Sequence, residues 1–177
     1  MVNMKTFIWL LLVLLPLQSM SQEELNKFDT PAGTWEQKHK IQVESDIYFS
    51  CDLNLEEYRN DGEWGSTISL HFNNPKEKDE VAFHVTKSQE DDFLVFGISH
   101  RKKMVTDYDE TILSIKRVSD KIKLSMVLSE NVIHFYASDG MNQSSKYFII
   151  LPQYSASEAS LVTSGTKGTF TCENKRI

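Results

Sequence analysis

The chain is poor in residues that cross-link or interrupt a fold, since its 177 residues include only two cysteines, seven glycines and four prolines. It also lacks the local signatures of common enzymes: a Gly-x-Ser-x-Gly elbow, a phosphate-binding glycine loop and a His-Glu-x-x-His pair. Positive charge is scarce too, because the formal net charge is −6, whereas a nucleic-acid-binding protein would need a basic face. These absences favour a non-enzymatic protein without a cofactor, a metal site or a nucleic-acid partner.

Long apolar runs are confined to the N-terminus. The weakly basic Met1–Lys5 precedes the apolar run Phe7–Leu15, and Ser19 and Ser21 supply small residues at positions −3 and −1 of a cleavage site. This order is typical of a secretory signal peptide. A membrane span would need about 20 apolar residues, and this run has about half that number. We therefore expect residues 1–21 to be a signal peptide and the product to be secreted and extracellular, without a membrane span.

The two cysteines predict a single intramolecular disulfide, because an exported chain meets an oxidising compartment. Cys51 and Cys172 each lie in a segment where apolar and polar residues alternate, as they do in a β-strand. The predicted bridge therefore fastens the first long strand of a β domain to the last. For a closed loop of this size, the chain-entropy model gives about 5 kcal/mol of stabilisation as an upper value.

The rest of the chain predicts β-structure. Residues 22–40 are polar and contain Pro31 and Gly33, so we interpret them as a leader segment. Beyond it, short alternating segments separated by turns predict about nine strands, at residues 41–53, 67–73, 81–87, 93–100, 111–118, 121–129, 132–138, 146–151 and 169–173. The predicted fold class is all-β: a single-domain antiparallel β-sandwich of jelly-roll type over residues 41–177, with a closed barrel as the alternative.

Two histidines are the strongest candidates for a binding face. Residues 67–73 and 81–87 predict a hairpin, and its expected register pairs Leu70 with Val85, Phe72 with Phe83, and His71 with His84. Asn73 shares the polar face of this hairpin. Short hydrogen-bonding side chains on a rigid sheet suit a sugar ligand, although an ordinary solvated face and the start of a metal site remain alternatives, the latter without an evident third ligand.

Three further features bear on surface function. Trp64 lies in a turn-like stretch, and Trp35 in the leader segment; an exposed indole can stack on a sugar, or it can cap the core. Asn142 begins an N-glycosylation sequon in a turn, as expected of a secreted glycoprotein. The basic cluster His100–Lys103 follows an apolar strand and precedes an acidic stretch, so we interpret it as a solvated loop rather than an anion site.

The stretch Ser69–Asn73 resembles the His-x-Asn strand of galectins, in which His and Asn hold a galactoside. The resemblance implies a lectin-like β-sandwich with His71 and Asn73 at its site. The Trp-x-x-Glu of galectins, which follows downstream, is absent here.

Gly33-Thr34-Trp35 and Thr106-Asp107-Tyr108 resemble two short motifs of lipocalins. That resemblance implies an eight-stranded calyx around a small apolar ligand. More strands follow the second motif than a lipocalin has, and the lipocalin C-terminal helix has no counterpart in this sequence.

The longest resemblance runs from Val81 to Cys172. In the order of its apolar segments this stretch is similar to the β-sandwich module named after farnesoic acid O-methyltransferase, which is itself similar to the sugar-binding part of natterin-like proteins. The Gly-Gly-Trp and Phe-Trp hallmarks of the module are absent. The resemblance implies a β-sandwich and a sugar ligand.

Together these features predict a secreted, non-enzymatic binding module that recognises a glycan or another extracellular ligand, protein or small molecule. The candidate ligand-binding residues are His71, Asn73, His84 and Trp64. A lipocalin-like carrier of a small apolar ligand is the first alternative. A secreted hydrolase is the second, and it would need two carboxyl groups facing one cleft.

Overall fold

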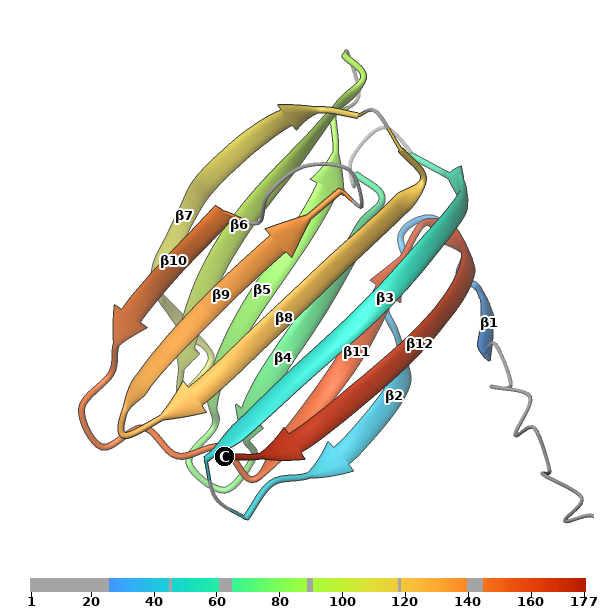
Figure 1. The fold of residues 1–177 in the computed structure, drawn as a ribbon. Coiled ribbons are helices and arrows are strands. Elements are labelled where there is room, and N and C mark those ends of the chain that lie inside the picture. Colours follow the sequence, from blue (N-terminus) through green and yellow to red (C-terminus); the bar gives the residue numbers. More distant parts are fainter. Residues whose placement is uncertain (1–25, 45, 61–64, 89–90, 118, 140–144) are drawn as a thin grey trace, which may run out of the picture.

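The computed structural model describes residues 26–44, 46–60, 65–88, 91–117, 119–139 and 145–177, which form β-strands and no helix (Figure 1). In chain order these strands are β1 (Asn26–Asp29), β2 (Glu36–Gln42), β3 (Ile47–Tyr58), β4 (Thr67–Asn74), β5 (Asp79–Lys87), β6 (Phe93–Lys102), β7 (Val105–Lys116), β8 (Lys121–Ser129), β9 (Val132–Ser138), β10 (Ser145–Ile150), β11 (Glu158–Ser164) and β12 (Thr166–Arg176).

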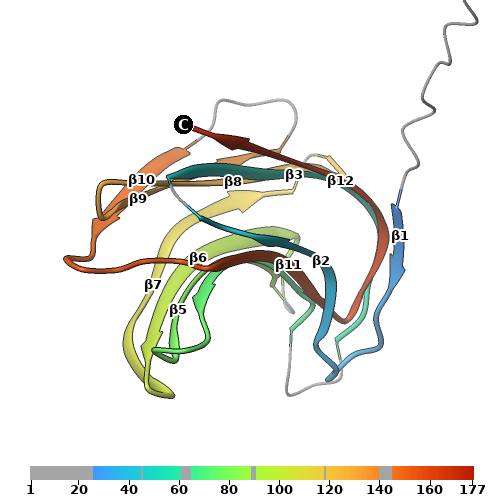
Figure 2. The same cartoon turned by 90° about the horizontal axis from the view of Figure 1, so that it is seen from below.

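The strands form two six-stranded antiparallel sheets that pack face to face. Sheet A has the order β1-β12-β3-β8-β9-β10, and sheet B has the order β2-β11-β4-β5-β6-β7. Figure 2 shows that both sheets curve, with the outer face of sheet B on the concave side. The prediction of an all-β antiparallel sandwich is confirmed, and the alternative of a closed barrel is wrong, because the strands form two separate sheets.

The core lies between the sheets and is built by alternation along each strand. In β8, Ile122, Leu124, Met126 and Leu128 point inward and are buried, as their spacing predicts. Sheet B meets them with buried aromatic side chains, and the ring of Phe83 lies 5.4 Å from that of Phe135 in sheet A. Burying side chains of this size stabilises a fold by about 1.5–3 kcal/mol each, so the filled core holds both sheets rigidly in place.

The predicted disulfide is present between β3 and β12. Cys51 and Cys172 are direct partners in the ladder between these adjacent strands, with their Cα atoms 4.1 Å apart. The Cys51 side chain is fully buried in the core, and Cys172 packs against the core as well. The bridge therefore fastens two neighbouring strands of sheet A from the inside.

The strand count of about nine was too low, because the structure has twelve strands. β1 and most of β2 lie in the segment expected to be a leader, the predicted strand 41–53 is divided between the end of β2 and β3, and β11 lies where no strand was predicted. The strands β1 and β2 lie at sheet edges, where an outward side chain meets solvent and polar residues conceal the strand pattern. Among the described residues, no helix has the length and apolarity needed to cross a bilayer.

Candidate functional site

The concave outer face of sheet B carries an open groove of about 620 Å³. Its lining includes side chains from β4, β5, β6 and β7 and one from the β1–β2 turn, among them Trp35, His71, Glu80, His84, Arg101 and Asp109. The strands place these side chains because every second residue of a strand points away from the core. The groove is therefore floored by rigid backbone rather than by loops.

The β4–β5 register differs from the predicted one by two residues. Ser69 pairs with His84, and His71 pairs with Ala82, so the expectation that the two histidines stand opposite each other is wrong. Both strands run closer to the turn than expected, and Lys78 closes the turn in a left-handed conformation at φ 52°. A shift of two residues preserves the face of a strand, so both histidines still face the groove.

Both ring nitrogens of His71 are engaged by protein groups. Nδ1–H donates to Glu80 Oε1 at 2.8 Å, and Nε2 lies 2.8 Å from Ser69 Oγ. The hydrogen bond from His71 holds the pKa of Glu80 below its ordinary value, against the opposing effect of burial. Glu80 is therefore ionised at neutral pH and can accept hydrogen bonds from hydroxyl groups. His71 acts as a positioning residue for Ser69 and Glu80.

His84 is the candidate that can contact a ligand directly. Burial lowers the pKa of its imidazole, an effect that the nearby Asp109 partly opposes. The ring is therefore neutral near pH 7, with one nitrogen as donor and the other as acceptor. It lies over Gly97 of β6, its partner in the ladder, where a Cβ atom would overlap the ring. The absence of a side chain at Gly97 thus leaves the space that the imidazole of His84 occupies.

Trp35 is the aromatic side chain of the groove. It follows the β1–β2 turn, its side chain is half exposed, and it lines the groove together with side chains of β4 and β5. The start of the turn is anchored by a buried hydrogen bond of 2.6 Å between the hydroxyl groups of Thr30 and Thr163. Gly33 takes a left-handed φ of 73° within the turn, a conformation that favours glycine. These contacts fix the turn that carries the indole.

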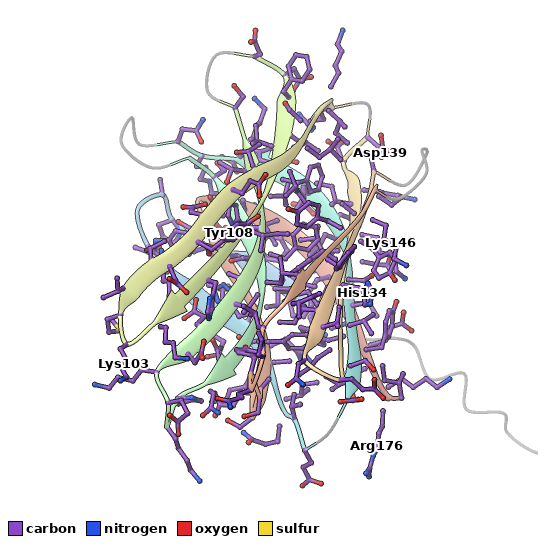
Figure 3. The ribbon with its side chains drawn as sticks, turned by 90° about the vertical axis from the view of Figure 1, so that its left-hand side faces the viewer. Lys103, Tyr108, His134, Asp139, Lys146 and Arg176 are labelled. Atoms are coloured by element: carbon purple, nitrogen blue, oxygen red, sulfur yellow. A yellow bond between two sulfur atoms is a disulfide. The ribbon has the colours of Figure 1, made fainter. Side chains whose placement is uncertain are left out.

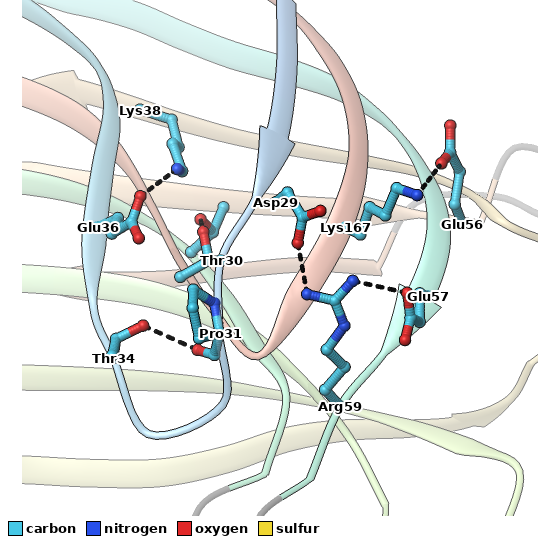
Figure 4. Close-up of polar contacts among 11 residues, drawn as sticks. Asp29, Thr30, Pro31, Thr34, Glu36, Lys38, Glu56, Glu57, Arg59 and Lys167 are labelled. Carbon is cyan, nitrogen blue, oxygen red and sulfur yellow. Dashed lines mark hydrogen bonds and ion pairs between the residues drawn. The ribbon is translucent and has the colours of Figure 1, made fainter.

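A set of exposed ion pairs fastens β1 to the end of β3 beside this turn (Figure 4). Arg59 donates to Asp29 and, at 2.7 Å, to Glu57. Figure 4 shows the guanidinium between the two carboxylates. Its charge lowers the pKa of both acids, through hydrogen bonds that outweigh their small loss of hydration. The β1 strand, although short, is thereby held on the sheet.

The remaining residues predicted from the sequence lie outside the groove or outside the described residues. Asn73 lies at the end of β4, two residues beyond His71, and lines an adjoining pocket rather than the groove. Trp64, Asn142 and the predicted signal peptide lie outside the described residues. Within the part of the chain that the structure describes, no group of three or more His, Cys, Asp or Glu side chains could hold a metal ion.

Sequence reasoning did not place Glu80, Arg101 and Asp109 in the site. The signal that could have found Glu80 is its position two residues before Ala82 on the same face as His84. Arg101 and Asp109 come from β6 and β7, whose pairing contains two bulges, so their faces could not be inferred from alternation alone.

Comparison with solved structures gives β-sandwiches of low sequence identity. Sheep Galectin-11 in complex with glycerol matches with a TM-score of 0.53 and 11% identity, over 83% of this chain and 100% of that chain. The Caenorhabditis elegans galectin LEC-6 matches with a TM-score of 0.55 and 10% identity, over 85% and 96%. The alginate lyase from Klebsiella pneumoniae matches with a TM-score of 0.54 and 11% identity, over 75% of this chain and 60% of that chain.

These likenesses show the fold, a galectin-like β-sandwich, and no more. No protein-family description matches the sequence, and no curated protein matches it. The resemblance to the module named after farnesoic acid O-methyltransferase is therefore not confirmed. The neighbours include both galectins and an enzyme, so the fold leaves the choice between binding and catalysis to the site.

Proposed function

We propose that this protein is a secreted carbohydrate-binding module and that the groove on sheet B holds the glycan. The observation that carries the proposal is the combination in one groove of an exposed indole, Trp35, with short polar groups held on rigid strands. Sugars are recognised in this way, because an indole packs on their C–H face while fixed donors and acceptors meet their hydroxyl groups.

The polar groups of the groove have different hydrogen-bonding roles. The ionised Glu80 accepts from sugar hydroxyls, and the neutral His84 both donates and accepts. Ser69 and Glu80 are held by His71, so less conformational entropy is lost when a ligand binds. The likeness to galectins supports a carbohydrate ligand at the level of the fold.

Secretion is part of the same proposal. It is supported by the apolar N-terminal run with small residues at a cleavage position, and by a disulfide buried within sheet A, a bond that persists in oxidising compartments. Asn142 would then carry an N-linked glycan. Expression in cultured animal cells tests both points: we expect a product that begins at Gln22 in the medium and loses mass on treatment with an N-glycosidase.

A carrier of apolar ligands is not favoured, because large side chains such as Phe83 and Phe135 fill the space between the sheets. Glycoside hydrolysis is not favoured either, although Glu80 and Asp109 line one groove. A hydrolase needs a carboxylic acid whose pKa is raised so that it can donate a proton. The pKa of Glu80 is shifted in the opposite direction.

The proposal is tested by glycan-array screening followed by calorimetric titration of the best ligand. Trp35→Ala and His84→Ala should each lower the affinity about tenfold or more. His134→Ala is the matched control, because His134 lies in β9, on the outer face of sheet A (Figure 3). Equal affinity of Trp35→Ala, His84→Ala and the unmodified protein would place the glycan elsewhere, and release of shorter saccharides during incubation would make the protein an enzyme.

A further inference from the structure

A second pocket, of about 410 Å³, adjoins the groove where the β4–β5 and β6–β7 hairpins turn. We call it the hairpin pocket. Glu80 and Arg101 line both the groove and the hairpin pocket, so the two lie side by side. The lining of the hairpin pocket also includes Asn73, Lys78 and Met104. A ligand in the groove that reaches past Glu80 and Arg101 enters the hairpin pocket.

The carboxylates of the hairpin pocket are already occupied by protein partners. Their contacts are Asp79 Oδ1 to His100 Nε2 at 2.7 Å, Glu80 Oε1 to His71 Nδ1 at 2.8 Å, and Glu158 Oε1 to Lys40 Nζ at 2.7 Å. A carboxylate that is bonded in this way attracts a further cation less strongly than a free one. Lys40 balances the charge of Glu158, and the two histidines each occupy an acceptor oxygen of Asp79 or Glu80.

The two cations of the hairpin pocket lack such partners. Neither Lys78 nor Arg101 forms an ion pair with a carboxylate in the part of the chain that the structure describes. Lys78 is held in place by its backbone, since its carbonyl accepts a hydrogen bond of 2.7 Å from the Lys103 amide in the opposite hairpin. Arg101 is the cross-strand partner of Glu80 and its charge acts on that carboxyl, but no carboxylate of the described residues closes an ion pair with Arg101 or Lys78.

The turn of the β6–β7 hairpin borders the hairpin pocket. Lys103 and Met104 both have left-handed φ values, 51° and 69°, a conformation that costs about 1 kcal/mol or more for residues other than glycine. Met104 is 84% exposed, and Figure 3 shows Lys103 at the tip extending away from the molecule. Met104 borders the hairpin pocket and offers it an apolar surface.

We propose that the hairpin pocket binds an anionic group of the saccharide, a carboxylate or a sulfate ester, by means of Arg101 and Lys78. The inference rests on the proposed function, because it names the chemical class of the glycan in the groove. A guanidinium can hold either group with two parallel hydrogen bonds. Asn73, whose side-chain amide makes no hydrogen bond with another described residue, can meet a neighbouring hydroxyl. The ligand class is therefore an acidic oligosaccharide rather than a neutral one.

The test compares three oligosaccharides of one length: a uronic-acid-containing chain, its carboxyl-reduced neutral form, and the neutral form carrying one sulfate ester. We expect the unmodified protein to prefer both anionic forms over the neutral form. Arg101→Gln and Lys78→Gln should each reduce the ratio of anionic to neutral affinity about tenfold. Lys116→Gln, at the far end of β7, is the matched control and should leave the ratio unchanged. The two anionic forms distinguish a carboxylate ligand from a sulfate ligand.

A parallel titration with inorganic sulfate, followed by NMR, examines the hairpin pocket without a sugar. Shifts of the amide signals of Asn73, Lys78 and Arg101 that vanish in Arg101→Gln are expected. Equal affinity for neutral and anionic saccharides, or an equal loss with Lys116→Gln, would overturn the inference and leave the proposed function intact. If no saccharide binds, the proposed function is wrong. In that case the sulfate titration alone tests whether the hairpin pocket binds an anion. If the amide signals do not shift, the hairpin pocket is not an anion site.

Discussion

Gly97 lies opposite His84 in the β5–β6 ladder, and the imidazole of His84 occupies the space that a Cβ atom at residue 97 would fill. The nearest atoms to such a Cβ are ring atoms at the end of a rotatable side chain, while the next is the backbone carbonyl of Glu110 at 3.2 Å. A methyl group at residue 97 should therefore displace the ring rather than break the sheet.

Gly97→Ala should lower glycan affinity to nearly the level of His84→Ala, because it moves the ring out of position. The free energy of unfolding should change by about 1 kcal/mol or less. In a double-mutant cycle, adding Gly97→Ala to His84→Ala should have little further effect on affinity. Additive losses would show that residue 97 acts on binding by another route. Calorimetric titration of the unmodified protein, the two single variants and the double variant measures the affinities, and urea unfolding measures the stabilities.

The disulfide should contribute to stability and not to binding. Removing it with Cys51→Ala and Cys172→Ala together frees a loop with a sequence separation of 121 residues, and we expect a loss of about 2–5 kcal/mol in the free energy of unfolding. Alanine is chosen because serine would place a hydroxyl in the core at Cys51. Urea unfolding measures the change. An unchanged denaturation midpoint would contradict the prediction, as would a lost affinity in protein that is still folded.

The Thr30–Thr163 hydrogen bond anchors the turn that carries Trp35. Thr163→Val leaves the buried hydroxyl of Thr30 without its partner, and we expect a cost of about 1–3 kcal/mol. Replacing both residues by valine should cost less than the single change, because no buried hydroxyl is then left unpaired. Chemical denaturation of the three variants provides the values. A double variant less stable than Thr163→Val would contradict this account.

His84 makes stability depend on pH. Burial lowers its pKa in the folded protein below the ordinary value of 6.5, so the unfolded chain takes up a proton first as the pH falls. Stability from this group is therefore present above about pH 6.5 and is lost as the pH drops through the lowered folded-state pKa. The difference in free energy of unfolding between about pH 7.5 and pH 5.5 should be smaller in His84→Gln than in the unmodified protein. Equal differences would show that His84 is not the group responsible.

Glu80 acts in a more acidic range. Its pKa lies below the ordinary 4.5 because His71 donates a hydrogen bond to it, so the stability it contributes is present above about pH 4.5 and is lost at lower pH. In His71→Ala the pKa of Glu80 should rise, which NMR titration of its side-chain carbon would detect. A Glu80 titration curve that does not move would remove His71 as the cause.

Much of the sandwich could be predicted from alternation. The inward run Ile122–Leu128 and the bridge between Cys51 and Cys172 follow from the period of a strand and the chemistry of an exported chain. The polar face with His71 and His84 was predicted too, because a slip of two residues does not change the face. Such features depend on whether each side chain is apolar or polar, and not on which residues pair across the strands.

The parts that could not be predicted depend on how distant segments meet. β1 and β2 are short edge strands, and only their pairing with β12 and β11 brings Trp35 to the groove. Likewise, only the structure shows that Arg101 stands opposite Glu80 in the β5–β6 ladder while Glu80 accepts a hydrogen bond from His71. The prediction of a solvated loop at His100–Lys103 is wrong for residues 100–102, which lie in β6, where His100 is buried beside Asp79.

The strand β5 serves the core and the groove at alternate residues: Val81, Phe83 and Val85 are buried in the core, while Glu80 and His84 line the groove. Specificity can therefore drift by substitution at the groove positions while the fold stays intact. A one-residue insertion or deletion within Asp79–Lys87 would exchange the two sets, turning charge inward and phenylalanine outward. We expect natural variation in this strand to change residue type and never length, with length variation confined to the hairpin turns.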